Sequence, residues 1–261
     1  MTPWIWNVDP VLLHVGPLQL RWYGLLFVGG FFLAIVIGRR IFKAEGHNPL
    51  LLDDLLLYLL VGAVIGARLM HCLAYEPDYY LAHPIEILKV WKGGLASHGG
   101  LIGALIALWL FARKHRLDTL WLLSRAAVVA PMVGGFIRLG NFFNSEILGL
   151  PTQQPWGVVF ARIDTLPRHP VQLYEAAAYF ALFALFYALW KRRPKAKTTY
   201  LMPGIALVAV FTIRFLLEYV KTKQADYTWD LPLSTGQALS LPFIVLGLVW
   251  LVWGMRKLKR V

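Results

Sequence analysis

Charged side chains stand inside long apolar stretches of this sequence, where they are energetically unfavourable. Arg68, Arg138 and Arg214 are flanked by apolar runs, and so are Glu175 and Glu218. A charged residue within a membrane marks function by default. The arginines outnumber the carboxylates, and the planar guanidinium group matches phosphate. The set therefore indicates a site for an anion, and within a bilayer that anion is a phospholipid headgroup.

Further polar residues could complete such a site, although each also has a structural explanation. His98, followed by two glycines, could accept a proton near pH 7 or could simply pack. Asn141 and Asn144 could donate hydrogen bonds to ester or phosphate oxygens, or could cap the end of their helix. Arg214 and Glu218 are four residues apart and could neutralise each other.

The elements that must position these residues are transmembrane helices. Hydrophobic residues make up 58% of the 261-residue chain and charged residues only 15%, whereas soluble domains are about a quarter charged. The net charge of +12 would suit nucleic acid, but Lys and Arg cluster in short runs between apolar stretches, which argues against a nucleic-acid partner. The single cysteine, Cys72, excludes an intramolecular disulfide. The N-terminus has no basic region, so no cleavable signal peptide is expected.

The apolar stretches predict an all-α integral membrane protein of about seven transmembrane helices, with residues 1–261 forming a single transmembrane domain. A span requires roughly 20 apolar residues. The predicted spans lie near residues 18–38, 53–73, 95–112, 119–142, 171–190, 200–220 and 236–255.

The loop charges predict the orientation of these spans. Fifteen of the 26 Lys and Arg residues fall in segments on one side and six on the other. By the positive-inside rule the N-terminus lies outside and the C-terminus in the cytoplasm. The external segments are then an arm at 74–94, whose amphipathic part could lie along the membrane interface, and a small head at 143–170 between spans four and five. This orientation places most buried polar groups in the outer half of the bilayer.

Two other functions are weighed against a lipid-processing enzyme. A transporter or channel for an anionic substrate needs polar groups through both leaflets, and the inner half has few of them. An intramembrane hydrolase needs a nucleophile, and Ser97 beside His98 is the one candidate. Adjacent helical residues point about 100° apart, which makes a poor dyad.

Several motifs, in a shared order along the seven spans, carry a family resemblance. The most specific is RLGNFFNSE at 138–146, closing at Gly149. The others are RWYG at 21–24, GARL at 66–69, HGGLIG at 98–103, HPVQLYE at 169–175, RFLLE at 214–218, and Gly236-Gln237 with Ser240 and Pro242. The sequence resembles the bacterial prolipoprotein diacylglyceryl transferases over essentially its whole length. It departs from the family pattern at Ile137, where glycine is usual, and before Arg214, where a tyrosine is often found.

The resemblance implies an enzyme of the bacterial inner membrane that works at the outer leaflet without a cofactor or metal. Its substrates would be phosphatidylglycerol and preprolipoprotein signal peptides bearing a lipobox cysteine. The diacylglyceryl group would move to the cysteine thiol, and glycerol phosphate would leave. The catalytic residues expected on this basis are Arg138, Arg214 and, as general base, His98. The expected substrate-binding residues are Tyr23, Arg68, Asn141, Asn144, Glu146, Gly149 and Glu218.

Overall fold

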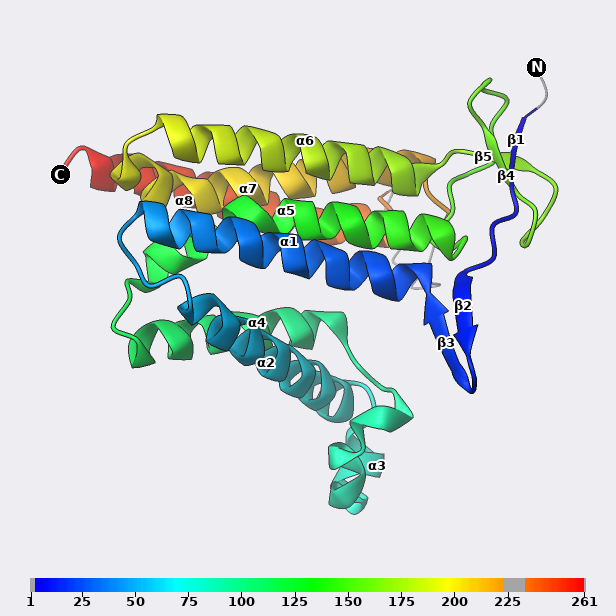
Figure 1. The fold of residues 1–261 in the computed structure, drawn as a ribbon, viewed down its shortest axis with the longest axis horizontal. Coiled ribbons are helices and arrows are strands. Elements are labelled where there is room, and N and C mark those ends of the chain that lie inside the picture. The colour runs from blue at the N-terminus through cyan, green and yellow to red at the C-terminus, as the bar shows by residue number, and fades with distance from the viewer. Residues whose placement is uncertain (1–2, 223–232, 261) are drawn as a thin grey trace. The chain divides into compact units, whose positions relative to one another are not determined.

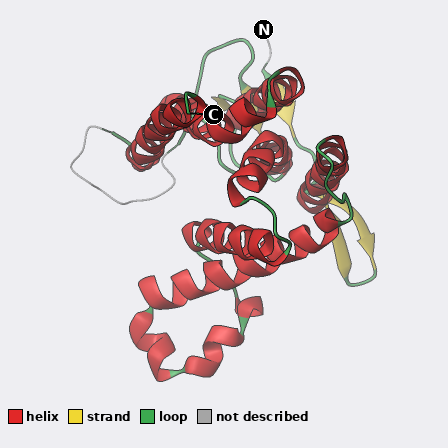
Figure 2. Cartoon of the chain, turned by 90° about the vertical axis from the view of Figure 1, so that its left-hand side faces the viewer, coloured by secondary structure: helices red, strands yellow, loops and turns green. Residues whose placement is uncertain are grey.

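Long helices dominate the computed structural model, which describes residues 3–222 and 233–260 (Figures 1 and 2). The helices of the described residues are α1 (Trp22–Ala44), α2 (Leu51–Ala74), α3 (Pro77–Ala82), α4 (Ser97–Lys114), α5 (Thr119–Phe143), α6 (Val171–Arg192), α7 (Lys195–Leu217) and α8 (Thr235–Leu258). Each of the seven predicted spans coincides with one long helix, and α3 lies in the predicted arm.

Six of these helices are long and apolar enough to cross a membrane, which supports a multi-pass membrane protein. They are α1, α2, α5, α6, α7 and α8. Helix α4 has 18 residues, begins with Ser97 and His98 and ends with Arg113 and Lys114, and it is not among the six. The seventh span and the orientation therefore stay predictions.

The chain forms two compact units, of which one comprises residues 38–123 and the other residues 1–37 with 124–261. In the first unit, α2 and α4 cross at glycines. A Cβ atom on Gly66 would lie 2.3 Å from the carbonyl oxygen of Gly99, and one on Gly103 would lie 2.0 Å from that of Gly62. Only glycine permits this approach, so the packing interpretation of these small residues is confirmed.

The second unit contains most of α5, helices α6 to α8, and the first part of α1. Pro131, Pro203 and Pro242 lie inside three of its helices, as membrane helices tolerate. Helix α8 begins with a capping box in which the Ser234 hydroxyl accepts from the Gln237 amide at 3.2 Å and the Gln237 side chain accepts from the Ser234 amide at 3.1 Å.

Short strands in this unit were not predicted. Strand β1 (Trp4–Trp6) pairs in parallel with β4 (Val158–Phe160), and β4 pairs antiparallel with β5 (Pro167–Arg168). Strands β2 (Val11–Val15) and β3 (Leu18–Arg21) form a hairpin. The predicted first span therefore begins too early, because residues 18–21 belong to the hairpin. Phe142, Val158 and Phe160 form a buried cluster beneath β1 and β4 that joins residues 143–170 to the end of α5.

Candidate active site

A buried carboxylate on α6 joins two cations at the centre of the candidate site. Glu175 is fully buried. One of its oxygens lies 2.7 Å from Arg138 Nε on α5, and the other accepts a hydrogen bond from Lys221 Nζ at 3.2 Å. Lys221 follows the 3-10 turn Glu218–Val220 that ends α7. The Arg138 guanidinium and the Lys221 ammonium group thus share the Glu175 carboxylate. These three side chains form a triad that keeps a net positive charge.

The signature segment at the end of α5 continues this network. Arg138 Nη1 donates to Asn141 Oδ1 at 3.2 Å, and Asn141 Nδ2 donates to Glu146 Oε1 at 2.8 Å. Asn144 Nδ2 reaches the same carboxylate oxygen at 3.3 Å. The chain turns back after the helix because the Glu146 amide donates to the carbonyl of Asn141 at 3.1 Å. Both asparagine side chains therefore pair with Glu146 in the described structure.

Left-handed backbone follows at two residues of this turn. Ser145 and Ile147 have φ values of 53° and 58°, which are unusual for residues other than glycine. The Ser145 hydroxyl and the side-chain oxygen Oδ1 of Asn144 are buried and have no hydrogen-bond partner among the described residues. Backbone strain and unsatisfied polar atoms often gather at functional sites, so the turn fits that description.

Gly149 lies at a close approach of three backbone segments. A Cβ atom there would meet the His169 carbonyl oxygen at 2.2 Å. Its neighbours pair with the end of α7, since the Leu150 amide donates to Val220 at 2.8 Å and the Thr222 amide to Leu148 at 3.0 Å. This pairing, which includes a bridge between Gly149 and Lys221, places the lysine beside Glu175.

Arg214, on the last turns of α7, differs from Arg138 in its contacts. Its side chain makes no hydrogen bond or ion pair with any residue of the described ranges, the Glu218 carboxylate included. Instead, the Glu218 carboxylate lies against α8, where a Cβ atom on Gly236 would meet it at 2.3 Å. The ring of Tyr179, on α6, lies within electrostatic range of Arg138, Glu175 and Arg214. A guanidinium without a partner in the described ranges therefore lies near the triad.

Tyr23 joins the same site from α1. Its ring packs on α5, where a Cβ atom on Gly140 would come within 2.7 Å of it. It also lies within electrostatic range of Glu146 and Arg138. Among the predicted site residues, the structure therefore brings together Tyr23, Arg138, Asn141, Asn144, Glu146, Gly149, Arg214 and Glu218.

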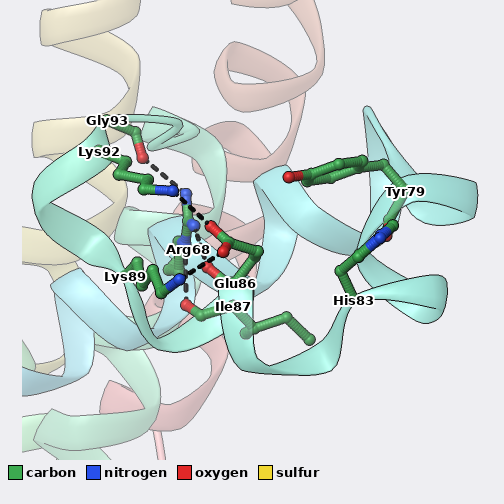
Figure 3. Close-up of polar contacts among 8 residues, drawn as sticks. All are labelled: Arg68, Tyr79, His83, Glu86, Ile87, Lys89, Lys92 and Gly93. Carbon is green, nitrogen blue, oxygen red and sulfur yellow. Dashed lines mark hydrogen bonds and ion pairs between the residues drawn. The ribbon is translucent and has the colours of Figure 1, made fainter.

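The remaining two predicted residues, Arg68 and His98, belong to residues 38–123. Arg68 is only 3% exposed, and its guanidinium lies inside the loop that follows α3 (Figure 3). It donates to the carbonyl oxygens of Glu86 at 2.5 Å, Ile87 at 2.9 Å, Gly93 at 2.6 Å and Gly94 at 3.2 Å. Positive φ angles at both glycines, 85° and 72°, turn the loop there. This arrangement favours a structural role for Arg68.

His98 lies in the first turn of α4 and is exposed. Its ring makes no hydrogen bond or ion pair with the part of the chain that the structure describes. The Ala96 amide, just before the helix, donates to the carbonyl of Ala67 at 3.0 Å and so fixes the start of α4 against α2. An exposed imidazole on an anchored helix start can accept a proton from a ligand.

Two residues of the charged network were not predicted as site residues. Lys221 follows an apolar span, so in the sequence it resembles any membrane-flanking lysine. Glu175 was noted as a buried carboxylate but was given no role. Its position one turn into a span was a signal, since a carboxylate in that environment requires a cationic partner.

Comparisons with known proteins point to one family. The family model described as prolipoprotein diacylglyceryl transferase matches residues 10–253. Among curated proteins, the phosphatidylglycerol–prolipoprotein diacylglyceryl transferase of Tolumonas auensis is 53% identical over 98% of this chain and 99% of its own length. The proteins of the same name from Chloroherpeton thalassium and Bacteroides fragilis are 48% and 39% identical, over 94% and 97% of this chain and 91% and 95% of their own.

Proposed function

The chain belongs to the prolipoprotein diacylglyceryl transferase family, and from this premise we propose how its buried charges carry out the transfer. The protein is a membrane transferase that moves the diacylglyceryl group of phosphatidylglycerol to a prolipoprotein. The acceptor is the thiol of the lipobox cysteine in the signal peptide. Its sulfur forms a bond to the glycerol carbon, the bond from that carbon to the phosphate oxygen breaks, and glycerol phosphate leaves. The thiol proton passes to a base.

The proposal rests on the Arg214 guanidinium, which has no hydrogen-bond or ion-pair partner among residues 3–222 and 233–260. Negative charge builds on the phosphate as the carbon–oxygen bond breaks, and preorganised donors lower the barrier to that step. Arg214 has no competing partner among the described residues, so its planar fork is available to phosphate oxygens. Arg138 contributes from a fixed direction, because Glu175 and Asn141 hold two of its nitrogen atoms.

The neighbouring side chains bind and orient the lipid. Tyr23 and Asn144 lie near the Arg138–Glu146 network and offer a hydroxyl and an amide to the headgroup and ester oxygens. Asn141 and Glu146 orient Arg138. Glu218 stays beside α8 and leaves Arg214 free. Gly149 allows the close backbone approach that places Lys221. Arg68 acts by holding the predicted arm, through carbonyls of residues 86–94.

His98 is the general base for the thiol. An unperturbed cysteine has a pKa near 8.5, so formation of the thiolate in an apolar site requires a base or a positive field. A neutral imidazole can act as a general base, and the exposure of His98 lets a peptide reach it. The cations Arg138 and Arg214 assist by stabilising the thiolate.

The site faces the outer leaflet of the inner membrane, with the N-terminus and the external arm and head on that side and all seven helices spanning. The loop-charge bias supports this orientation. A reporter fused after Val261 should behave as cytoplasmic, and one inserted within 151–167 as external. The opposite pattern would invert the topology.

Transfer is tested by mixing the purified protein with phosphatidylglycerol and a lipobox peptide and analysing the peptide by mass spectrometry. We expect a diacylglyceryl thioether adduct and free glycerol phosphate. A peptide with serine in place of the cysteine is the matched control and should stay unmodified. Failure to form the adduct, together with flux of a small anion through reconstituted vesicles, would favour the transporter.

A further inference from the structure

A cavity of about 280 Å³ lies between α6 and α7, at the end of these helices away from Glu175. Leu189, Leu201, Met202 and Ile205 give it an aliphatic wall, and Arg193 and Lys197 lie at its rim. Thr198 also lines it, but its hydroxyl donates to the carbonyl of Lys195 at 2.9 Å and is therefore occupied. The cavity combines a hydrophobic side with a cationic one.

The rim cations lack acidic partners. The side chains of Arg193 and Lys197 make no hydrogen bond or ion pair with residues 3–222 or 233–260, and the sequence has no Asp or Glu between Glu175 and Glu218. The end of α8 packs here, since Trp250 Nε1 donates to the carbonyl of Tyr200 at 3.0 Å. That helix end adds only more cations. They are Arg256, Lys257, Lys259 and Arg260. The local field is therefore positive on every element that reaches the cavity.

Aromatic side chains place the cavity at headgroup depth. Tyr187 and Trp190 lie one to two turns before the rim on α6, and Tyr200, Trp250 and Trp253 contact one another on α7 and α8. Tyrosine and tryptophan gather where acyl chains meet headgroups. The rim cations then lie at the level of lipid phosphates, and the aliphatic wall at the level of acyl chains.

We propose that this cavity binds one anionic phospholipid, in the leaflet opposite to the transfer site. Its phosphate lies between Arg193 and Lys197, and one acyl chain runs along the aliphatic wall. Basic pockets between transmembrane helices recognise anionic headgroups in this way. A free phosphate would leave the apolar wall unused, so the occupant is a lipid. The site is separate from the charged network around Glu175 and independent of the reaction proposed there.

Native mass spectrometry of the purified full chain tests the proposal by titration with phosphatidylserine and with phosphatidylcholine. We expect the protein to retain one phosphatidylserine in clear preference to phosphatidylcholine. The double variant Arg193→Gln/Lys197→Gln should weaken this binding by about 30-fold, since each cation near the membrane surface contributes about a fivefold gain. Excess inorganic phosphate should not displace the lipid.

Three further variants make the test specific. Lys257→Gln/Arg260→Gln removes two charges from the same end that do not line the cavity, so affinity should fall much less than in Arg193→Gln/Lys197→Gln. Leu189→Trp keeps the cations but fills the wall, and it should weaken binding without a change of charge. Arg214→Lys should leave this binding intact. Equal retention of both lipids, equal loss in the Lys257/Arg260 variant, unimpaired binding by Leu189→Trp, or displacement by inorganic phosphate would overturn the proposal.

Discussion

Two arginines that stand within long apolar helices have opposite surroundings in this protein. Arg68 donates to four backbone carbonyls and stacks its guanidinium 5.0 Å from the ring centroid of Tyr80. The Arg214 side chain has no hydrogen-bond or ion-pair partner among the described residues. Both stand within long apolar stretches, so the sequence gives the same signal for both. The partners decide that one guanidinium shapes a loop while the other is available to a ligand.

Arg138 lies between these extremes. Its Nε atom lies 2.7 Å from the Glu175 carboxylate, and its Nη1 atom donates to Asn141 at 3.2 Å. These two contacts fix the direction of the guanidinium plane. A guanidinium that is partly satisfied keeps its orientation and still has N–H groups to offer. The three arginines therefore form a series from anchor to oriented donor to free donor, and substitutions can test each step.

The largest effect is expected when Arg214 is replaced. Arg214→Lys keeps the charge but removes the planar fork, so turnover should fall by about 10²–10³-fold, as when a preorganised donor to a developing anion is lost. Folding should be unaffected, because no described contact is broken. Arg138→Lys should also lose most activity and should insert normally. Near-normal turnover of either variant in the thioether assay would contradict the proposed contacts of these two arginines with the lipid phosphate.

His98→Ala should be nearly as harmful, with transfer slowed by about 10²-fold, the lower end of the range for general-base catalysis, because the arginines still stabilise thiolate. Binding of phosphatidylglycerol should be nearly intact, and raising the pH should partly restore the rate. His98→Gln can form hydrogen bonds but cannot act as a base, so it should be as slow as alanine. An active glutamine variant would leave His98 a packing or hydrogen-bonding role.

Lys221 is expected to matter through Glu175. Lys221→Met removes one of the two cations that hold the carboxylate, at the cost of a charged hydrogen bond of about 1.5–3 kcal/mol, so activity should fall about tenfold through misplacement of Arg138. Lys221→Arg should restore most of it. Measurement of kcat and KM for phosphatidylglycerol separates this role from misfolding, since a correctly folded variant should still bind peptide. Failure of arginine to rescue would remove Lys221 from the network.

Arg68→Lys should have a smaller effect on activity, a few-fold loss at most, because the residue acts on the loop and not on the lipid. Lysine cannot reach four carbonyls, so amide hydrogen exchange should accelerate in residues 84–94. This variant is the direct counterpart of Arg214→Lys. If both lose activity equally and the loop keeps its protection, the distinction between anchor and donor fails.

Much of this arrangement could be predicted from the sequence, and the reasons for the gaps are physical. Hydropathy located all seven long helices, and the order of the motifs identified the residues at the end of α5. The strands β1 and β4 were missed because three-residue strands leave no periodic signal. Lys221 was missed because its burial depends on backbone pairing with Gly149, a contact between distant segments. The roles of Arg68 and Arg214 differ through their partners, which a hydropathy pattern does not contain.

Replacement of Glu86 should have the smallest effect and gives the most discriminating test, because its backbone carbonyl and its carboxylate have different partners. Its backbone carbonyl accepts from Arg68, while its carboxylate pairs with Lys89 and, at 2.9 Å, with Lys92. The hydrogen bonds from these lysines lower the pKa of Glu86 to about 2 from its ordinary 4.5. A lowered pKa means that the stabilisation is present above pH 4.5 and is lost as the pH falls through about 2.

Glu86→Gln should therefore leave Arg68 anchored and keep activity within about twofold, since exposed ion pairs contribute little. For the same reason, hydrogen exchange in residues 84–94 should not change between about pH 5 and pH 8 beyond the intrinsic effect of pH on exchange. Arg68→Lys, measured in parallel, should accelerate amide hydrogen exchange in the same residues at every pH. If Glu86→Gln loosened the loop as much as Arg68→Lys, the surface lysine pairs would be its main support, and Arg68 would lose its role as the anchor.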